Sequence, residues 1–242
     1  MEKSQGVIGK IEYQLTRSRR RYRSVAIKVD ERGVVRVMAP MRINESEIER
    51  FLMSKYDWLL KVVGEIQAKV KQGRREFVEG EKHWFFGEEY PLVIFRSRSR
   101  KRPVVNLTAE AFEVEIAGGM AAAKEKLVVA DAMLKWYLNE GKKIIRTKVD
   151  ELVERLGLSY GELRIKRVSS IWGSCSARNN LNFNRKLIMA PHEVVDYVIA
   201  HEVCHIVHKH HRKSFWAMVA GLDPAYKKHV KWLRENSHVL SL

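Results

Sequence analysis

The sequence lacks the features that mark secreted and membrane proteins. Its two cysteines, Cys175 and Cys204, are too few for a disulfide framework and fit a reducing compartment. Residues 1–10 have no apolar stretch of the kind found in secretory signals, and no apolar run approaches the ~20 residues of a membrane-spanning helix. We therefore predict a cytoplasmic protein without a membrane partner.

Acidic residues are outnumbered, because 45 lysines and arginines against 29 aspartates and glutamates give a net charge of +16. Five of the seven residues 17–23 are arginine, and residues 96–102 hold five cations. Such clusters favour an anionic partner such as nucleic acid, nucleotide or acidic protein, although positive charge on edge strands also limits aggregation. The candidate anion-binding residues are Arg19, Arg20, Arg21, Arg98 and Arg100.

The hydrophobic pattern predicts an α+β protein. Alternating residues predict strands over 8–15, 22–29, 34–38, 76–86, 90–95, 104–107 and 112–116. A helix is expected from Asn44 or Ser46 to about Val70, and a longer one from Ala121 to about Leu156. Composition changes at Gly118-Gly119, so we predict a β-rich, basic N-terminal domain with one long helix over 1–118 and a second domain over 119–242.

The second domain continues with short strands and helices. Strands are expected at 163–168, 170–176 and 181–187, and helices at 215–222 and 225–236. Pro191 suits the first turn of another helix, which would run through an apolar segment, Val194 to Ala200.

That helix carries an H-E-x-x-H motif, His201-Glu202-Val203-Cys204-His205. Residues four apart lie about 40° apart around a helix and about 6 Å apart along it. Both imidazoles can therefore reach one zinc ion at about 2.0–2.1 Å, and Glu202 is placed to take a proton from the water that completes the coordination sphere. Histidines that emerge from a buried helix need a partner. The motif predicts a metal-dependent hydrolase.

A third ligand must come from elsewhere, and His208, His210 and His211 are the candidates. On a continuing helix His208 would lie about 10 Å beyond His201, too far to share one ion. His211 has the spacing of the third ligand in H-E-x-x-H-x-x-G-x-x-H zinc proteases. This arrangement requires the helix to end and the chain to turn back, where those enzymes have glycine and this chain has His208. Spacing favours His211, and we interpret the other two as surface or supporting groups.

Three segments within 166–216 resemble the YgjP-like metal-dependent hydrolases, relatives of the SprT-like and minigluzincin proteases. They are Trp172-Gly173-Ser174-Cys175-Ser176, Leu181-Asn182-Phe183-Asn184 with Leu187, and His201-Glu202-Val203-Cys204-His205 with His211, Phe215 and Trp216. The resemblance implies a zincin-like core in the second domain, with a small sheet and the motif helix. It also implies a zinc ion held by His201, His205 and His211, with Glu202 as general base.

Our main hypothesis is a zinc peptidase. The segment Trp172, Gly173, Ser174 and Cys175 would form an edge strand that binds an extended peptide through main-chain hydrogen bonds. Tyr197 and Tyr226 are candidates for stabilising the oxyanion, and Asn182 and Asn184 for supporting the histidines.

Two alternatives remain open. The same water could attack a phosphoanhydride, with the arginine clusters holding a nucleoside triphosphate, which would make the protein a pyrophosphatase. The second alternative is a basic nucleic-acid-binding module with a structural metal. Glu202 counts against the module, because a structural site does not need that carboxylate.

Overall fold

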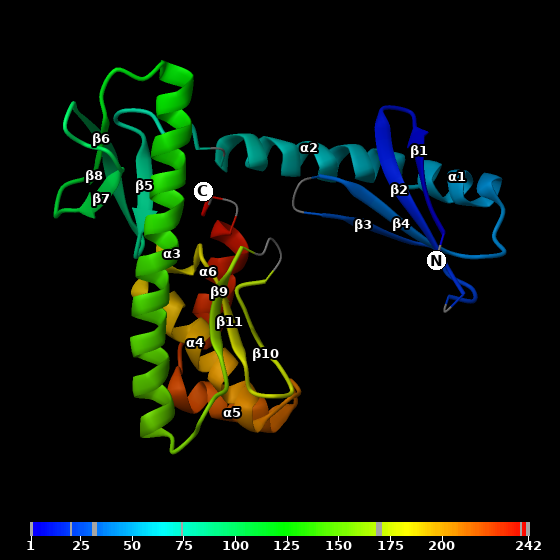
Figure 1. Cartoon of the computed structure of the whole chain (residues 1–242). Coiled ribbons are helices and arrows are strands. Elements are labelled where there is room, and N and C mark those ends of the chain that lie inside the picture. Colours follow the sequence, from blue (N-terminus) through cyan, green and yellow to red (C-terminus); the bar gives the residue numbers. More distant parts are fainter. Residues whose placement is uncertain are drawn as a thin grey trace. The chain divides into compact units, whose positions relative to one another are not determined.

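The computed structural model describes residues 2–19, 21–30, 33–73, 75–167, 171–237 and 239–240 (Figure 1). The chain divides into two compact units, Met1–Gly73 and Arg74–Leu242. Within the described residues, no helix has the length and apolar character needed to cross a bilayer.

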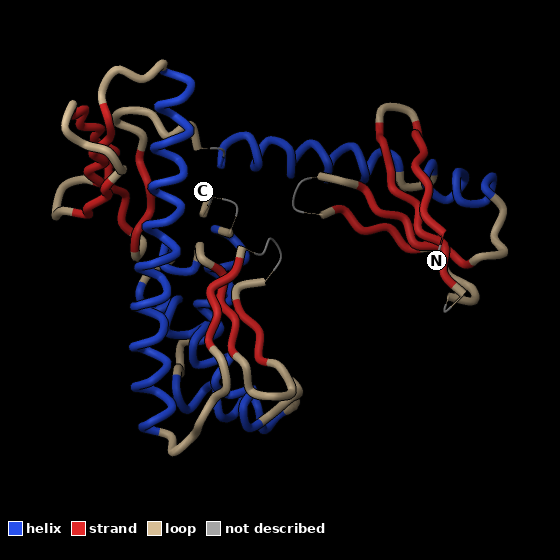
Figure 2. The backbone as a smooth tube through the Cα atoms, viewed as in Figure 1, coloured by secondary structure: helices blue, strands red, loops and turns tan. Residues whose placement is uncertain are grey.

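The first unit is a four-stranded sheet with two helices (Figure 2). Its elements are β1 (Glu2–Ile8), β2 (Ile11–Ser18), β3 (Ala26–Val29), β4 (Val35–Pro40), α1 (Glu45–Met53) and α2 (Tyr56–Gly73). The strand order is β1-β2-β4-β3, with β2 and β4 parallel and the other pairs antiparallel. Alternate residues of β2 and β4, such as Leu15 and Val37, are buried against Ile48, Leu52 and Leu59 of the helices.

The single helix expected over 44–70 is instead two helices. The break follows Met53, where the Ser54 hydroxyl donates to the Phe51 carbonyl at 2.7 Å and the Lys55 amide donates to the Leu52 carbonyl. This turn redirects the chain, so that α1 and α2 both contribute buried residues to one core.

The second unit contains two more sheets and four α-helices among the described residues. Its elements are β5 (Lys82–Phe85), β6 (Glu88–Ser97), β7 (Val104–Leu107), β8 (Phe112–Ala117), α3 (Ala122–Arg155), β9 (Leu163–Lys166), β10 (Gly173–Cys175), β11 (Leu181–Asn184), the 3-10 turn η1 (Leu187–Met189), α4 (His192–Val207), α5 (Lys213–Leu222) and α6 (Tyr226–Asn236). The strand orders are β5-β6-β8-β7 and β10-β11-β9. Ser170, where one strand was expected to begin, lies outside the described residues.

The long helix α3 contacts both sheets of this unit. Phe112 of β8 packs its ring against Tyr137 of α3, and the Tyr137 hydroxyl donates to the Trp84 carbonyl at 2.5 Å. Further along, α3 contacts β9 and α4. Along the chain the division between the compact units follows Gly73, whereas composition suggested a boundary at 118–119; β5–β8 share one core with α3.

Candidate metal centre

Helix α4 carries the H-E-x-x-H residues and packs in the core of the second unit. Its apolar residues, such as Val195 and Val203, are buried, and η1, α3, α5, α6 and β10 all contact it. His201 and His205 are half-buried, whereas Glu202 is 5% exposed. The local sequence thus forms a buried helix that places two imidazoles on one face, as the motif predicted.

The helix ends at Val207, and the chain turns back without a left-handed residue. His208 has φ −120° and ψ 100°, which is extended backbone that any residue adopts. Its amide donates to the Cys204 carbonyl at 2.9 Å, and its own carbonyl lies 2.8 Å from Nδ1 of His205. Histidine therefore serves where the zinc proteases with this spacing use glycine, and the turn brings His211 back over α4.

Three imidazole nitrogens converge on one point. Nε2 of His211 lies 3.1 Å from Nε2 of His205 and 3.2 Å from Nε2 of His201. Ligands of a tetrahedral zinc ion at about 2.0–2.1 Å lie about 3.3 Å from one another. All three side chains offer a ligand atom within 4.8 Å of the others, so this cluster fits a divalent metal ion.

The opposite ring nitrogens have partners that leave Nε2 free for such an ion. Nδ1 of His205 faces the His208 carbonyl, so this nitrogen carries the hydrogen. Nδ1 of His201 lies 3.3 Å from the hydroxyl of Tyr197, one turn earlier on α4. Hydrogen bonds of this kind fix the tautomer and the ring orientation of metal-binding histidines.

Burial favours the neutral form of His201 and His205, the form that binds a metal ion. Burial and the neighbouring imidazoles of His205 and His211 lower the pKa of His201 to about 4. Burial also lowers the pKa of His205, against the opposing effect of its bond to the His208 carbonyl.

Glu202 is a buried carboxyl beside this cluster. Its Oε2 has no hydrogen-bond partner among the described residues, and burial raises the pKa of Glu202 to about 8. The β10 backbone lies directly against it, because a Cβ atom at Gly173 would be 2.5 Å from Cγ of Glu202. A buried carboxyl with an unpaired Oε2 therefore adjoins His201 on α4.

The predicted substrate segment forms β10, an edge strand of its sheet among the described residues, preceded by Trp172. Gly173 lies against Glu202, whereas the Ser174 hydroxyl accepts a hydrogen bond from Asn182 and the Trp172 carbonyl accepts one from the Asn184 amide. Asn182 and Asn184, expected to support the histidines, both lie on β11, and the Asn184 side chain donates to the Ile171 carbonyl.

Two features of the site were not found in the sequence. Cys175 Sγ lies 3.3 Å from Nζ of Lys209, a contact across 34 residues that no motif indicates. Tyr197, a candidate for stabilising the oxyanion, also places its hydroxyl 3.3 Å from Nδ1 of His201. Its spacing of four residues before His201 was the available signal, because such residues share a helix face. Tyr226 stacks on Trp216.

An aromatic side chain supports all three imidazoles. Phe215 of α5 is fully buried, and its ring stacks on His205 with 4.4 Å between centroids. The rings of His201 and His211 lie 4.9 and 4.8 Å from it, edge to face. The short helix after the histidine turn thus packs under the cluster.

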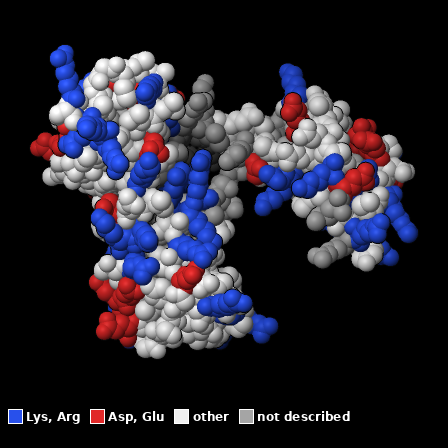
Figure 3. Space-filling view, in the orientation of Figure 1, with Lys and Arg blue, Asp and Glu red and all other residues white. Residues whose placement is uncertain are grey.

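The candidate anion-binding arginines are spread over both units. Arg19 and Arg21 belong to the first unit, Arg98 and Arg100 to the second, and Arg20 lies outside the described residues. Arg100 is paired with Glu115, and Arg21 bonds to Ser24. Figure 3 shows lysines and arginines on both units, interspersed with acidic side chains.

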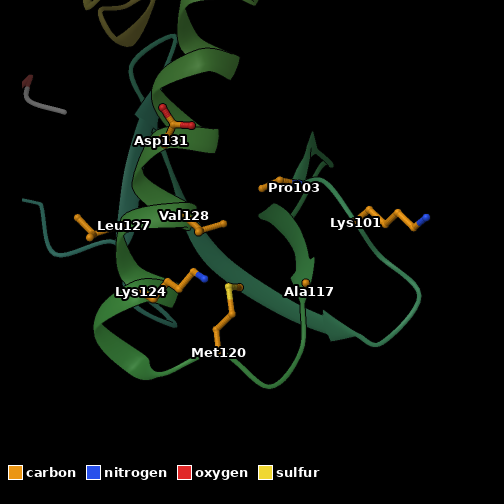
Figure 4. A pocket seen from close by; sticks show the side chains of 8 residues that line it. All are labelled: Lys101, Pro103, Ala117, Met120, Lys124, Leu127, Val128 and Asp131. Atoms are coloured by element: carbon orange, nitrogen blue, oxygen red, sulfur yellow. The ribbon is translucent and has the colours of Figure 1, made fainter.

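Neither of two surface cavities in the second unit is lined by any of the three histidines. One, of about 450 Å³, is lined by residues around the start of α3, including Met120, Lys124 and Val128 (Figure 4). The other, of about 420 Å³, includes Tyr197, Asp223 and His229. The histidine cluster is thus described by its convergent nitrogens.

The fold and the cluster describe an α+β protein able to hold a divalent ion. A family model described as "YgjP-like, metallopeptidase domain" matches residues 23–236. The chain belongs to this family, and at the family level it is a metal-dependent peptidase.

Other comparisons add little. The solved structure of the metallopeptidase zymogen abylysin of Pyrococcus abyssi is similar at 17% sequence identity, with 40% of this chain and 96% of that chain covered and a TM-score of 0.35. A comparison with curated proteins found no significant match.

Proposed function

We propose that this protein is a zinc-dependent peptidase in which His201, His205 and His211 hold the ion and Glu202 is the general base. One observation carries the proposal: three Nε2 atoms converge at tetrahedral spacing beside a buried carboxyl whose Oε2 is unpaired. In this proposal α4 and the sheet β9–β11 are the zincin-like core.

Bound zinc would act as a Lewis acid on the scissile carbonyl and lower the pKa of a water at the site to about 7. Glu202 accepts the proton of the attacking water at its free carboxylate oxygen and then passes it to the leaving amine. Burial raises the proton affinity of Glu202, whereas the positive charge of a bound metal ion would favour its ionised form. These opposing effects suit a group that takes up and returns a proton near neutral pH.

The edge strand β10 supplies the means of holding a peptide. Gly173 to Cys175 pairs with β11 on one side only among the described residues, so its other edge can take an extended chain by main-chain hydrogen bonding. Such binding is independent of side-chain sequence, which suits unfolded polypeptides as substrates.

The test is Glu202→Gln, with Glu193→Gln on the exposed side of the same helix as control. Purified proteins are loaded with zinc, assayed by elemental analysis, and incubated with unfolded proteins and with nucleotides, and products are read by mass spectrometry. We expect both variants to keep one zinc per chain. Glu202→Gln loses peptide hydrolysis by about 10²-fold or more, in the range that general-base catalysis contributes, and Glu193→Gln does not.

Full activity of Glu202→Gln on peptides rules out the general-base role. Cleavage of nucleoside triphosphates with no peptide products replaces the peptidase proposal by the pyrophosphatase alternative. A zinc content near zero in the wild type removes the metal centre altogether.

A further inference from the structure

Lys209 connects the histidine turn to the β10–β11 hairpin. Its ammonium nitrogen lies 3.0 Å from the Ser176 carbonyl, 2.6 Å from Oδ1 of Asn179 and 3.3 Å from Sγ of Cys175. A lysine has three N–H donors and no acceptor, so these three acceptors match its whole donor set. None of these acceptors is a carboxylate, so Lys209 is held by hydrogen bonds and not by an ion pair.

The acceptors are held in place without the lysine. The Asn179 amide donates to the Ser176 carbonyl, the Ser176 amide donates to the Asn180 carbonyl, and the Ser176 hydroxyl accepts from the Asn180 amide. Asn179 has φ 58°, a left-handed conformation that asparagine tolerates better than most residues do. This tight turn therefore presents fixed oxygens to the lysine.

The segment that receives this support carries the most exposed of the three imidazoles. His201 and His205 lie on α4, whereas His211 lies beyond the helix on residues 208–212, in backbone that is neither helix nor strand. The His205 ring meets the His208 carbonyl at the start of that segment, and the Trp216 amide donates to the Arg212 carbonyl at its end. Between these two hydrogen bonds, Lys209 attaches the segment to the β10–β11 turn.

We propose that Lys209 is a positioning residue for the metal centre: it fastens residues 208–212 to the β10–β11 turn and so sets where His211 stands relative to the other two histidines. The inference rests on the proposed function. Because metal sites demand ligand positions within a few tenths of an ångström, a looser segment must be ordered at the cost of binding free energy. The same hairpin places Gly173 against Glu202. The Lys209 hydrogen bonds therefore link the segment that carries His211 to the strand that packs on Glu202.

The experiment measures metal affinity and ligand geometry directly, on the full-length chain. Lys209→Met keeps the length of the side chain and removes its donors, Lys209→Arg keeps donors, and Asn179→Gly removes one acceptor while favouring the left-handed turn. Lys213→Met, an exposed lysine four residues on, is the matched control for lost charge. Zinc affinity is measured by chelator competition, and coordination by the visible absorption spectrum of the cobalt-loaded protein.

We expect Lys209→Met to weaken zinc binding by about 10–100-fold, the range seen when supporting contacts of metal ligands are removed. Asn179→Gly has a smaller effect in the same direction, Lys209→Arg restores most of the affinity, and Lys213→Met leaves it unchanged. The cobalt spectrum shifts for Lys209→Met and Asn179→Gly only.

Three results would overturn this inference or its basis. A wild-type protein that binds no zinc defeats the proposed function itself. Wild-type affinity and an unchanged cobalt spectrum in Lys209→Met defeat the positioning role and leave the function standing. Equal weakening by Lys213→Met shows that charge alone acts. Should Lys209→Met fail to fold, Asn179→Gly decides by the same two readouts.

Discussion

At the residue scale, the approach of Gly173 to Glu202 determines where the proposed base can stand. A Cβ atom at position 173 would lie 2.5 Å from Cγ of Glu202 and 2.6 Å from its Oε1, distances that no real side chain adopts. The carboxyl is buried and cannot swing freely into solvent. Glycine is therefore required at this position by the neighbouring carboxyl and not by its own backbone angles.

We expect Gly173→Ala to displace the Glu202 carboxyl and lower peptide hydrolysis by about 10²-fold, the effect of an ångström of misplacement in a catalytic group. Zinc content is unchanged, because the contacts of a Cβ at this position are with Glu202. Gly221→Ala, where a Cβ meets nothing within 4 Å, is the control. A Gly173→Ala protein with wild-type kcat would show that Glu202 has room to move.

The buried ionisable groups also predict how the metal-free protein responds to pH. Burial raises the pKa of Glu202 from 4.5 to about 8, so the folded state keeps a proton that the unfolded state releases, and stability falls as pH rises across that window. Burial lowers the pKa of His201 and of His83 from 6.5 to about 4, so these two groups make stability rise with pH up to 6.5.

Between pH 6.5 and 8, therefore, Glu202 acts without opposition from these histidines. We expect the free energy of unfolding of the chelator-treated wild type to fall over this interval in urea titrations. Glu202→Gln flattens the fall, and Glu193→Gln does not. An identical slope in Glu202→Gln would mean that the Glu202 carboxyl is not kept neutral by burial.

At the element scale, hydrophobic periodicity predicted the helix α3 but missed the turn that separates α1 from α2. The helix expected over 121–156 is α3 at Ala122–Arg155, ended by Gly157 at φ 64°, because a long apolar stripe and a glycine stop are both local signals. The strands expected over 22–29 and 34–38 are β3 and β4, which pair antiparallel. The strand expected over 76–86 shortens to Lys82–Phe85, and the backbone amides of Glu76 and Phe77 donate to the Glu81 carboxylate.

For the candidate site, the same distinction holds between local and distant contacts. The spacing of His201, His205 and His211 predicted their convergence, because helix geometry and a turn fix those distances. The contact between Lys209 and the β10–β11 turn joins residues 30 or more apart, and no periodic pattern encodes it. The sequence thus predicted the three proposed ligands but not the hydrogen bonds of Lys209 that support them.

At the scale of the whole molecule, each compact unit has a core of its own. The buried cluster of the first unit is formed by residues such as Val37 and Leu52, and that of the second by residues such as Phe112 and Val195. All residues of the proposed centre lie in the second unit. The compact units thus divide the chain after Gly73, and the predicted boundary at 118–119 is tested by fragments.

We predict that residues 74–242 alone fold and bind zinc with the affinity of the full chain, whereas residues 119–242 do not fold. The shorter fragment lacks β5–β8, which leaves the fully buried side chains Val129, Met133 and Tyr137 of α3 without the sheet, including Phe112, that packs on this helix. Exposed apolar surface on this scale promotes aggregation. Circular dichroism, size-exclusion chromatography and chelator competition compare the two fragments. A soluble, zinc-binding 119–242 fragment would support the boundary at 118–119, and loss of zinc binding in 74–242 would show that the first unit contributes to the centre.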